Sequence, residues 1–384
     1  MEHPHPRASR GIPSSGTSVG LLSTYPPTRC GLATFSEALA EALVTEHGAS
    51  ISTVRVMDEL AVPGSAAPKP GRQVVAELVA DDPAGITGAA AALNRADVAV
   101  IQHEYGIFGG PDGADVIAVM EELIVPVIVV LHTVLETPSD NQRLVLERVA
   151  ALADAVVVMT AVAGEILGRR YCVDARKVGV IEHGVPVWTR DADRAPSELP
   201  QIITWGLIGP GKGIEWAIRA MAELRDSGVR AQYTVHGQTH PKVVASQGEA
   251  YRESLAALVT ELGLEGDVVL DGRYLDPAEL AAAVAVADAV LLPYDSRNQV
   301  TSGVLVEALA AGKPVVATAF PHALELLDEG RAVAHQDPAA MAAALRDVLL
   351  GSAVALSAPA AVSWPEAAGR FLALAERLRH ERAA

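Results

Sequence analysis

Residues 289–318, AVLLPYDSRNQVTSGVLVEALAAGKPVVAT, contain the pattern that decides the fold. An apolar run at 289–292 leads through a polar loop into a short apolar helix, and a second apolar run follows at 315–318. Gly312 ends the helix, and Pro314 prevents it from continuing. The order of strand, loop, helix and strand predicts one unit of a parallel sheet.

The loop and helix of this unit predict a binding site for a nucleoside diphosphate. Thr301, Ser302 and Gly303 stand at the helix start, where free backbone N–H groups and the positive end of the helix dipole suit a phosphate. Gly303 lets the phosphate approach the backbone closely. Glu307 lies one helical turn further on, and its carboxylate suits the two hydroxyls of a ribose.

Further apolar runs extend the pattern over the whole chain. In the first half, we expect strands at 18–23, 51–56, 74–79, 98–102, 127–131, 155–159 and 178–182, and helices at 35–46, 85–94, 114–124 and 141–152. In the second half, we expect strands at 202–205, 232–236, 268–271, 290–292 and 315–318, and helices at 214–226, 251–262, 277–286 and 338–350. Val, Ile and Leu runs that alternate with helices predict parallel sheets covered on both faces. Two such doubly wound α/β domains leave a cleft that faces the carboxyl ends of both sheets.

Changes in this pattern predict the domain boundaries. Residues 187–200 are polar, lack periodicity and contain Pro196 and Pro200, so they are predicted to form a linker. We expect a disordered leader at 1–16, Rossmann-like domains at 17–186 and 201–355, and a C-terminal segment at 356–384. That segment is predicted to contain an amphipathic helix at 364–382.

The composition argues against several classes of protein. The chain has 384 residues, half of them hydrophobic, and a net charge of −17. This acidity argues against nucleic acid or a strongly anionic membrane as the main partner. No apolar run has the length of a transmembrane helix. Cys30 and Cys172 are too few for a disulfide framework and indicate a reducing compartment. We expect a cytoplasmic protein without a stable membrane span.

Residues 206–213, GLIGPGKG, form a second candidate phosphate site. Gly209 and Gly211 would let the loop wrap a diphosphate while Lys212 neutralises its charge. An ordinary tight turn would use the same glycines. The loop is not a Walker loop, because Gly213 stands where Ser or Thr should follow the lysine. Because the loop shares a domain with the helix start described above, we favour phosphate binding.

Polar residues also follow strands of the first half. His132 comes directly after the strand at 127–131, where it either caps the strand end or hydrogen-bonds a sugar hydroxyl as a neutral imidazole. His103 and Glu104, followed by Tyr105, form either a salt-bridged turn or a group that contacts an acceptor.

Two further signatures are missing from the sequence. No group of His, Cys, Asp or Glu has metal-ligand spacing, so no metal is expected. The Gly-x-Gly-x-x-Gly fingerprint with a downstream acid is missing after the first strand. This absence disfavours a dinucleotide-dependent dehydrogenase.

Together these motifs resemble the retaining glycosyltransferases of family 4, which have the GT-B fold, over about residues 18–378. In that family a glycine of the first loop lies near the donor diphosphate, which implies this role for Gly31. A histidine after a central strand of the first domain contacts the donor sugar, which implies that role for His132. Residues 206–213 match the segment Gly-Arg-Leu-x-x-x-Lys-Gly that opens the second domain.

The rest of the second half resembles the family as well. Two glutamates with seven residues between them flank the start of the family's phosphate-binding helix, and Gln299 and Glu307 occupy these positions. Residues 310–318 are typical of the family. From Trp364 onward the chain resembles the last helix, which in GT-B enzymes crosses back to pack on the first domain.

Two positions depart from the family pattern. Leu207 replaces the arginine that helps the lysine to hold the diphosphate, so another cation, Arg273 or Arg297, would have to assist. Gln299 replaces the first glutamate, which in the family lies near the donor sugar. A subgroup with a Gly-Leu-x-x-Pro-Gly-Lys-Gly-Ile-Glu loop, a Thr-His-Pro turn and a Gln-x-Thr-Ser-Gly loop has the same features. The departures are therefore typical of that subgroup.

The resemblance implies a retaining, metal-independent glycosyltransferase. It would move a sugar from a GDP- or UDP-linked donor to a hydroxyl of a saccharide, small-molecule or lipid acceptor, with no further cofactor. The implied catalytic residues are His132, Lys212 and Glu307; the implied donor-binding residues are Gly31, Gly209, Gly211, Lys212, Arg273, Gln299, Thr301, Ser302, Gly303 and Glu307; the acceptor side is His103, Glu104 and Tyr105. The alternatives are another GT-B enzyme, such as a sugar-nucleotide epimerase or a phosphorylase, and a non-catalytic sugar-nucleotide-binding protein. A homo-oligomer is also open.

Overall fold

The computed structural model describes residues 16–57, 72–188, 198–328, 330–351 and 361–384. The predicted leader, except for Gly16, and residues 189–197 of the predicted linker lie outside this range. The predicted boundary at 355–356 lies outside it as well. The domain boundaries therefore stay predictions.

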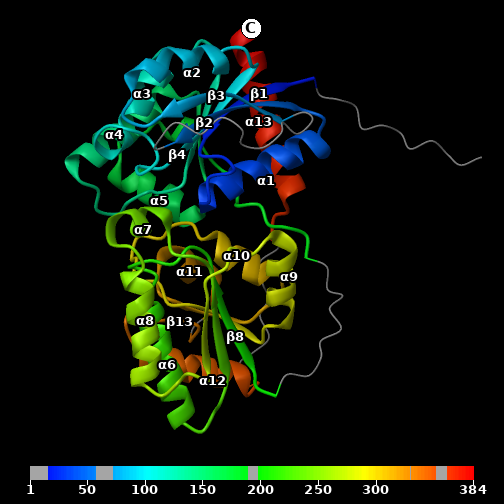
Figure 1. Cartoon of the computed structure of the whole chain (residues 1–384). Helices are drawn as coiled ribbons and strands as arrows, with labels where there is room; N and C mark the ends of the chain where they lie inside the picture. The colour runs from blue at the N-terminus through cyan, green and yellow to red at the C-terminus, as the bar shows by residue number, and fades with distance from the viewer. Residues whose placement is uncertain (1–15, 58–71, 189–197, 329, 352–360) are drawn as a thin grey trace, which may run out of the picture.

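The first half of the chain forms a seven-stranded parallel sheet in the order β3-β2-β1-β4-β5-β6-β7 (Figure 1). Its strands are β1 (Ser18–Ser23), β2 (Ser50–Met57), β3 (Arg72–Val79), β4 (Val98–His103), β5 (Val127–Leu131), β6 (Ala155–Val158) and β7 (Val178–Val180). The helices between them are α1 (Gly31–Thr45), α2 (Ile86–Leu93), α3 (Asp115–Glu121), α4 (Asp140–Leu152) and α5 (Ala161–Arg170), with short 3₁₀ turns at Pro83–Gly85, Pro111–Gly113 and Ala175–Lys177.

The second half repeats this order in a six-stranded parallel sheet, β10-β9-β8-β11-β12-β13, within the described residues. Its strands are β8 (Gln201–Trp205), β9 (Gln232–His236), β10 (Val268–Asp271), β11 (Ala289–Leu292), β12 (Val315–Thr318) and β13 (Ala332–Val333). Its helices are α6 (Ile214–Asp226), α7 (Pro241–Gln247), α8 (Ala250–Glu261), α9 (Pro277–Val286), α10 (Gly303–Ala310), α11 (Pro321–Leu326) and α12 (Pro338–Leu349). The predicted class, two doubly wound α/β domains, is confirmed.

Both faces of each sheet are buried, which explains the continuous apolar runs. In β5, Val127, Val129 and Leu131 belong to one hydrophobic cluster, whereas the alternate residues Ile128 and Val130 belong to another on the opposite face. Successive side chains of a strand point to opposite faces, so a strand covered on both sides is apolar along most of its length.

The last helix, α13 (Trp364–Ala383), packs on the first domain beside α1 (Figure 1). Ala368, Phe371, Leu372 and Ala375 share a hydrophobic cluster with residues of β1 and α1, and their spacing places them on one helical face. Just before the helix, the backbone N–H of Val185 donates to the carbonyl of Val362 at 2.9 Å. The chain therefore returns to the first domain after the second domain is complete.

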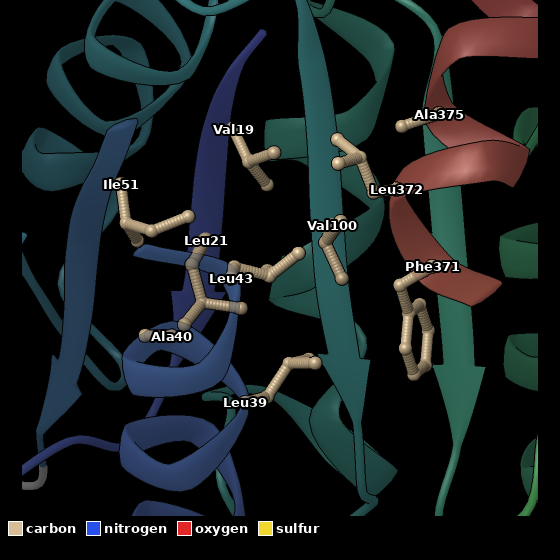
Figure 2. Close-up of a pocket in the computed structure, with 10 residues that line it drawn as sticks. All are labelled: Val19, Leu21, Leu39, Ala40, Leu43, Ile51, Val100, Phe371, Leu372 and Ala375. Atoms are coloured by element: carbon tan, nitrogen blue, oxygen red, sulfur yellow. The ribbon is translucent and has the colours of Figure 1, made fainter. Parts of the chain in front are cut away.

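A small apolar cavity lies in this part of the core (Figure 2). It is lined by Val19 and Leu21 of β1, Ile51 of β2, Val100 of β4, Leu39, Ala40 and Leu43 of α1, and Phe371, Leu372 and Ala375 of α13. Because its lining carries no polar side chain, we interpret it as a packing defect rather than as a ligand site.

The largest difference between a predicted and an observed boundary is at the start of the first helix. Helix α1 begins at Gly31, four residues before the predicted start at Phe35. The Sγ atom of Cys30 accepts a hydrogen bond from the backbone N–H of Ala33 at 3.3 Å and so caps the helix. Cysteine is not among the usual N-cap residues, and the sequence pattern therefore misses this start. The pattern also misses α5, α7, α11 and β13.

The carboxyl ends of the two sheets meet where the domains touch. From the loop after β1, Arg29 donates to the Oε1 atom of Gln238, which follows β9, at 2.9 Å. From α7 of the second domain, the Nζ atom of Lys242 donates to the carbonyl of Gly106, after β4, at 2.8 Å. Helices α7, α10 and α11 lie at this boundary (Figure 1).

Candidate functional site

The strand order of each sheet indicates where a ligand should bind. The direction of winding reverses between β1 and β4 in the first sheet and between β8 and β11 in the second. Loops at such a switch point diverge and leave a crevice at the carboxyl ends of the strands. In the second sheet these loops are residues 206–213 and 293–302, and the backbone N–H of Asp295 donates to the carbonyl of Gly211 at 3.0 Å. The two predicted phosphate motifs are therefore adjacent.

Lys212 is the positive charge of this crevice. Its Nζ atom lies 4.7 Å from the ring centroid of Tyr294, a cation–π contact. Burial lowers the pKa of Lys212. Within the described residues its ammonium group contacts no carboxylate. A half-buried ammonium without a counter-charge is a suitable partner for a phosphate.

Gly213 is required here by the backbone itself. Its φ angle is +65°, and a Cβ atom would lie 1.9 Å from the carbonyl oxygen of Pro293. A side chain at this position would therefore push apart the two loops that form the crevice.

Glu307 lies deeper, in the second turn of α10. Its Oε2 atom accepts a hydrogen bond from the Nε1 atom of Trp205, at the end of β8, at 3.3 Å. Burial raises the pKa of Glu307 to about 7, and the bond from Trp205 only partly opposes this effect. The carboxylate has no lysine partner among the described residues, so it is not an ordinary surface carboxylate.

The start of α10 is held by hydrogen bonds within the second domain. Ser302 caps the helix, since its side chain accepts from the backbone N–H of Leu305 at 3.3 Å. The backbone N–H of Ser302 donates to the Nδ1 atom of His322, on α11, at 2.9 Å. Ser302 is therefore engaged within the protein. The amides of Gly303 and Val304, in the first turn, have no intrahelical acceptor and are the ones suited to a phosphate.

Gly303 has a second role that the sequence does not reveal. A Cβ atom at this position would lie 2.9 Å from the Nε2 atom of His183, which follows β7 in the first domain. The missing side chain therefore makes room for this imidazole. His183 and His322 are the residues that the sequence analysis missed. The available signal was the polar His183-Gly184 pair, which follows a predicted strand.

Gln299 and Thr301, in the loop before Ser302, have different surroundings. The Nε2 atom of Gln299 donates to the carbonyl of Thr301 at 2.5 Å, so this side chain folds back on its own loop. The Oγ1 atom of Thr301 is buried and has no hydrogen-bond partner within the described residues.

His132 belongs to a ring cluster at the end of the first sheet. The ring of Phe35 packs edge-on against His132 at 4.8 Å, His183 at 5.1 Å and Trp364 at 5.0 Å. The Nε2 atom of His132 is 2.7 Å from the Oε1 atom of Gln102, which can only accept, so Nε2 carries the hydrogen. Burial lowers the pKa of His132 to about 3 and that of His183 to about 4. Both rings are therefore neutral at pH 7.

The predicted acceptor residues are less accessible than expected. The side chain of His103 is fully buried, and neither ring nitrogen has a hydrogen-bond partner within the described residues. The alternative of a salt bridge between His103 and Glu104 is therefore wrong. Glu104 instead accepts a hydrogen bond from Thr133, and burial raises the pKa of Glu104. Tyr105 contacts the ring of His103 at 5.2 Å.

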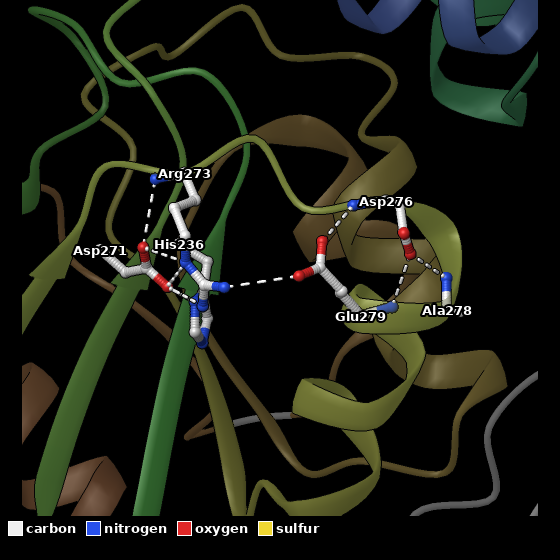
Figure 3. A network of polar contacts seen from close by, with 6 residues as sticks. All are labelled: His236, Asp271, Arg273, Asp276, Ala278 and Glu279. Carbon is white, nitrogen blue, oxygen red and sulfur yellow. Dashed lines mark hydrogen bonds and ion pairs between the residues drawn. The ribbon is translucent and has the colours of Figure 1, made fainter.

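Arg273, one of the two suggested helper cations, is already paired. Its guanidinium contacts Asp271 at 2.8 Å and Glu279 at 3.4 Å (Figure 3). The hydrogen bond from Arg273 holds the pKa of Asp271 well below its usual range. Arg297 is exposed and forms no ion pair within the described residues. Arg297 is therefore the better of the two candidates.

Gly31, the remaining predicted donor residue, is exposed in the first turn of α1. Gly209 and Gly211 lie in the loop beside Lys212. Among the residues that the structure describes, no group of three His, Cys, Asp or Glu side chains could hold a metal ion.

Comparisons with known proteins agree with this architecture. Residues 200–350 match the sequence model of the family "Glycosyl transferases group 1". The chain is similar to D-inositol 3-phosphate glycosyltransferase from Nocardioides sp., with 31% identity over 276 residues. The match covers 64% of this chain and 58% of the length of that protein.

Solved structures share the fold over nearly the whole chain. A glycosyltransferase from Rickettsia africae has a TM-score of 0.71 and 13% identity, covering 95% of this chain and 99% of its own. HepE from Anabaena in complex with UDP-glucose has a TM-score of 0.67 and 15% identity, covering 96% and 99%. The protein therefore has the GT-B fold. Within this fold, residues 200–350 are similar to the group 1 glycosyltransferases.

Proposed function

We propose that the protein is a retaining glycosyltransferase that moves a sugar from a nucleoside-diphosphate sugar to an acceptor hydroxyl. The observation that carries this proposal is the arrangement at the switch point of the second sheet. There, the loops and the helix that follow β8 and β11 carry an ammonium group without a counter-charge, the free amides of a helix start and a half-buried carboxylate, and all three lie around Tyr294.

Each of these groups has a role in the transfer. As the bond to the sugar breaks, negative charge develops on the leaving diphosphate. Lys212 and the first amides of α10 would stabilise that charge without reorganising. Glu307, in its ionised form, would accept hydrogen bonds from the two ribose hydroxyls. Arg297 is the available replacement for the cation that Leu207 does not supply.

The first domain would receive the sugar and the acceptor. As a neutral ring that donates through Nε2, His132 has Nδ1 left as an acceptor for a sugar hydroxyl. Glu104 and Tyr105, in the loop after β4, would lie on the acceptor side. His103 is fully buried and would act there only through the residues that it packs against.

The donor and acceptor are proposed from the relatives. HepE binds UDP-glucose, and an E. coli trehalose-6-phosphate structure of the same fold contains UDP-2-fluoro glucose. These complexes make a UDP-linked sugar the first choice, with a GDP-linked sugar as the alternative. The name of the Nocardioides relative favours a polar small-molecule acceptor over a lipid. No helix among the described residues is long and apolar enough to cross a membrane. A cytoplasmic location and a homo-oligomer stay predictions.

The test begins with a panel of nucleotide sugars, ranked by how far each raises the melting temperature. The best donor is then incubated with candidate acceptors, and the labelled sugar is traced. Transfer to an acceptor with the anomeric configuration retained supports the proposal. An epimerised nucleotide sugar or a sugar phosphate would instead indicate one of the other GT-B activities. Donor binding without transfer or slow hydrolysis would indicate the non-catalytic alternative.

The same assay tests the requirement for a metal. Because Lys212 and the helix amides would take the charge that a divalent cation carries elsewhere, we expect transfer to continue in excess chelator. Loss of transfer that magnesium or manganese restores would contradict a metal-independent mechanism.

A further inference from the structure

The first domain holds the loop that precedes α10, although this loop belongs to the second sheet. Val300, near the end of this loop, is only 1% exposed, and its side chain belongs to a hydrophobic cluster of the first domain that includes Leu131 and Val158. Its carbonyl accepts a buried hydrogen bond from the Oγ1 atom of Thr160, after β6, at 2.9 Å. Gln299 and Thr301 flank this anchor point, so the shape of the proposed donor loop depends on a contact between domains.

Thr160 serves both domains with one hydroxyl group. It is the N-cap of α5, where its Oγ1 atom accepts from the backbone N–H of Ala163 at 3.1 Å. A hydroxyl has one hydrogen to donate and lone pairs to accept. The hydroxyl of Thr160 donates its hydrogen to the carbonyl of Val300 and accepts from the amide of Ala163. Because the cap of α5 uses the acceptor side of the hydroxyl, its hydrogen is left for Val300.

A carboxylate of the second domain completes this junction. Glu325, on α11, accepts from the backbone N–H of Ala161 at 3.1 Å and from that of Val162 at 3.0 Å. A carboxylate at a helix start is stabilised by the free amides and by the helix dipole. Helix α11 therefore docks on the start of α5.

The same short helix also holds the donor loop from its own side. The Nδ1 atom of His322, on α11, accepts from the backbone N–H of Ser302, and the backbone N–H of His322 donates to the carbonyl of Gln299 at 3.2 Å. The loop is thus tied to α11 at two points and to Thr160 at a third. Helix α11 is in turn tied to α5 through Glu325.

We propose that Thr160 and Glu325 are positioning residues that couple contact between the domains to the shape of the loop that binds the nucleotide sugar. They touch neither the donor nor the acceptor. They act through Val300, Ser302 and the start of α10. This inference rests on the proposed function for its effect on turnover, but its structural part is independent of that function.

The test compares two helix caps. Thr160→Val keeps the shape of the side chain and removes both hydrogen bonds of the hydroxyl. The matched control is Ser139→Ala, which removes the exposed N-cap of α4 in the same domain, where the hydrogen bonds of Ser139 stay within that helix among the described residues. Thr160→Ser should restore the hydroxyl, and exposed Glu325→Ala tests the second half of the junction.

The readouts are kcat/KM for the donor, the KM for the acceptor and the hydrogen exchange of the Ser302 amide. In Thr160→Val we expect a fall of about three- to tenfold in donor kcat/KM, the size of one lost hydrogen bond. The KM for the acceptor should stay unchanged, and hydrogen exchange of the Ser302 amide should accelerate. In Glu325→Ala, donor kcat/KM should also fall and exchange of the Ser302 amide should also accelerate. Thr160→Ser and Ser139→Ala should match the wild type in both.

The proposal is overturned if Ser139→Ala impairs donor use as much as Thr160→Val does, because the effect would then be general helix destabilisation. It is also overturned if exchange at Ser302 is unchanged in both Thr160→Val and Glu325→Ala. Because Glu325 is at the surface, Glu325→Ala keeps the test decisive if Thr160→Val does not fold. If wild type uses no nucleotide sugar, the proposed function fails. The exchange comparison still decides whether the first domain positions the loop.

Discussion

The two domains have similar strand orders, but the side chains at the strand ends are neutral in the first domain and charged in the second. In the first domain, the ends of β4, β5 and β7 present His103, His132 and His183, and burial lowers the pKa of each imidazole to about 4, 3 and 4. In the second, the ends of β8 and β11 lead to Lys212, the start of α10 and Glu307. We therefore expect the shared topology to determine where ligands bind and the side chains to determine which part of a ligand binds at each place.

This difference suits a donor whose two halves differ in charge. A diphosphate needs a cation and free amides, which the second domain supplies. Sugar and acceptor hydroxyls need neutral donors and acceptors, which the first domain supplies. A charged imidazole in that domain would be buried without a counter-ion at a high cost. Three tests examine whether the second domain binds the diphosphate and how it contacts the first domain.

The largest effect is expected for Lys212→Ala. Loss of a charge-assisted contact to a phosphate should cost about 1.5–3 kcal/mol, or roughly ten- to a hundredfold in affinity for the nucleoside diphosphate. Calorimetry measures the affinity, and steady-state kinetics measures the accompanying fall in turnover.

The matched control for this change is Lys177→Ala in the first domain, where the ammonium donates to the carbonyls of Ala151 and Ala153. We expect it to leave binding of the nucleoside diphosphate unchanged. Unchanged affinity and turnover in a folded Lys212→Ala variant would remove Lys212 from the site.

The next effect concerns the point where the two domains touch. Gly303→Ala would place a Cβ atom 2.9 Å from the Nε2 atom of His183. We expect this overpacking to lower the free energy of unfolding by about 1–3 kcal/mol. Denaturant unfolding measures the change.

Two further variants sharpen this test. Combining Gly303→Ala with His183→Ala should recover part of the loss, because the clash disappears. Gly168→Ala, in α5 with nothing near its new Cβ atom, should instead gain up to about 1 kcal/mol. If Gly303→Ala is as stable as the wild type, the room at Gly303 does not serve His183.

The smallest effect is a pH dependence that only the second domain should have. Only the ionised form of Glu307 accepts from both ribose hydroxyls, and burial raises its pKa to about 7. Affinity for the nucleoside diphosphate should therefore rise by roughly tenfold between pH 6 and pH 8 and level off above. Glu307→Gln should remove this component, leaving only that of the phosphate itself. Equal slopes in both proteins would show that Glu307 does not read the ribose.

The same shift has an opposite consequence for stability. Because the pKa of Glu307 is higher in the folded than in the unfolded protein, the folded state holds its proton more tightly. Protonated Glu307 therefore contributes to the stability of the folded state fully below about pH 4.5, and this contribution is lost as the pH rises through about 7. Ligand affinity and unfolding free energy should change in opposite directions over this range.

Much of this protein could be predicted from short stretches of its sequence. Continuous apolar runs such as that of β5 predict buried strands, because a strand covered on both faces packs apolar side chains on both. The glycines and Lys212 between β8 and α6 predict a phosphate loop, because backbone freedom and charge are properties of adjacent residues. These features depend on interactions within about one turn or one strand, and the chain order alone records them.

Other features were decided only by the tertiary structure. Gly303 and His183 meet although 120 positions separate them, and no local pattern pairs them. The pairing of Arg273 with Asp271 and Glu279 depends on how β10 and α9 are arranged. Because of this pairing, Arg273 is less suited to bind a phosphate than the sequence alone suggests. The first two amides of α5 donate to Glu325 of the other domain. Each of these contacts depends on the packing of distant segments, because burial and charge pairing are set by what the folded chain brings together rather than by neighbours in sequence.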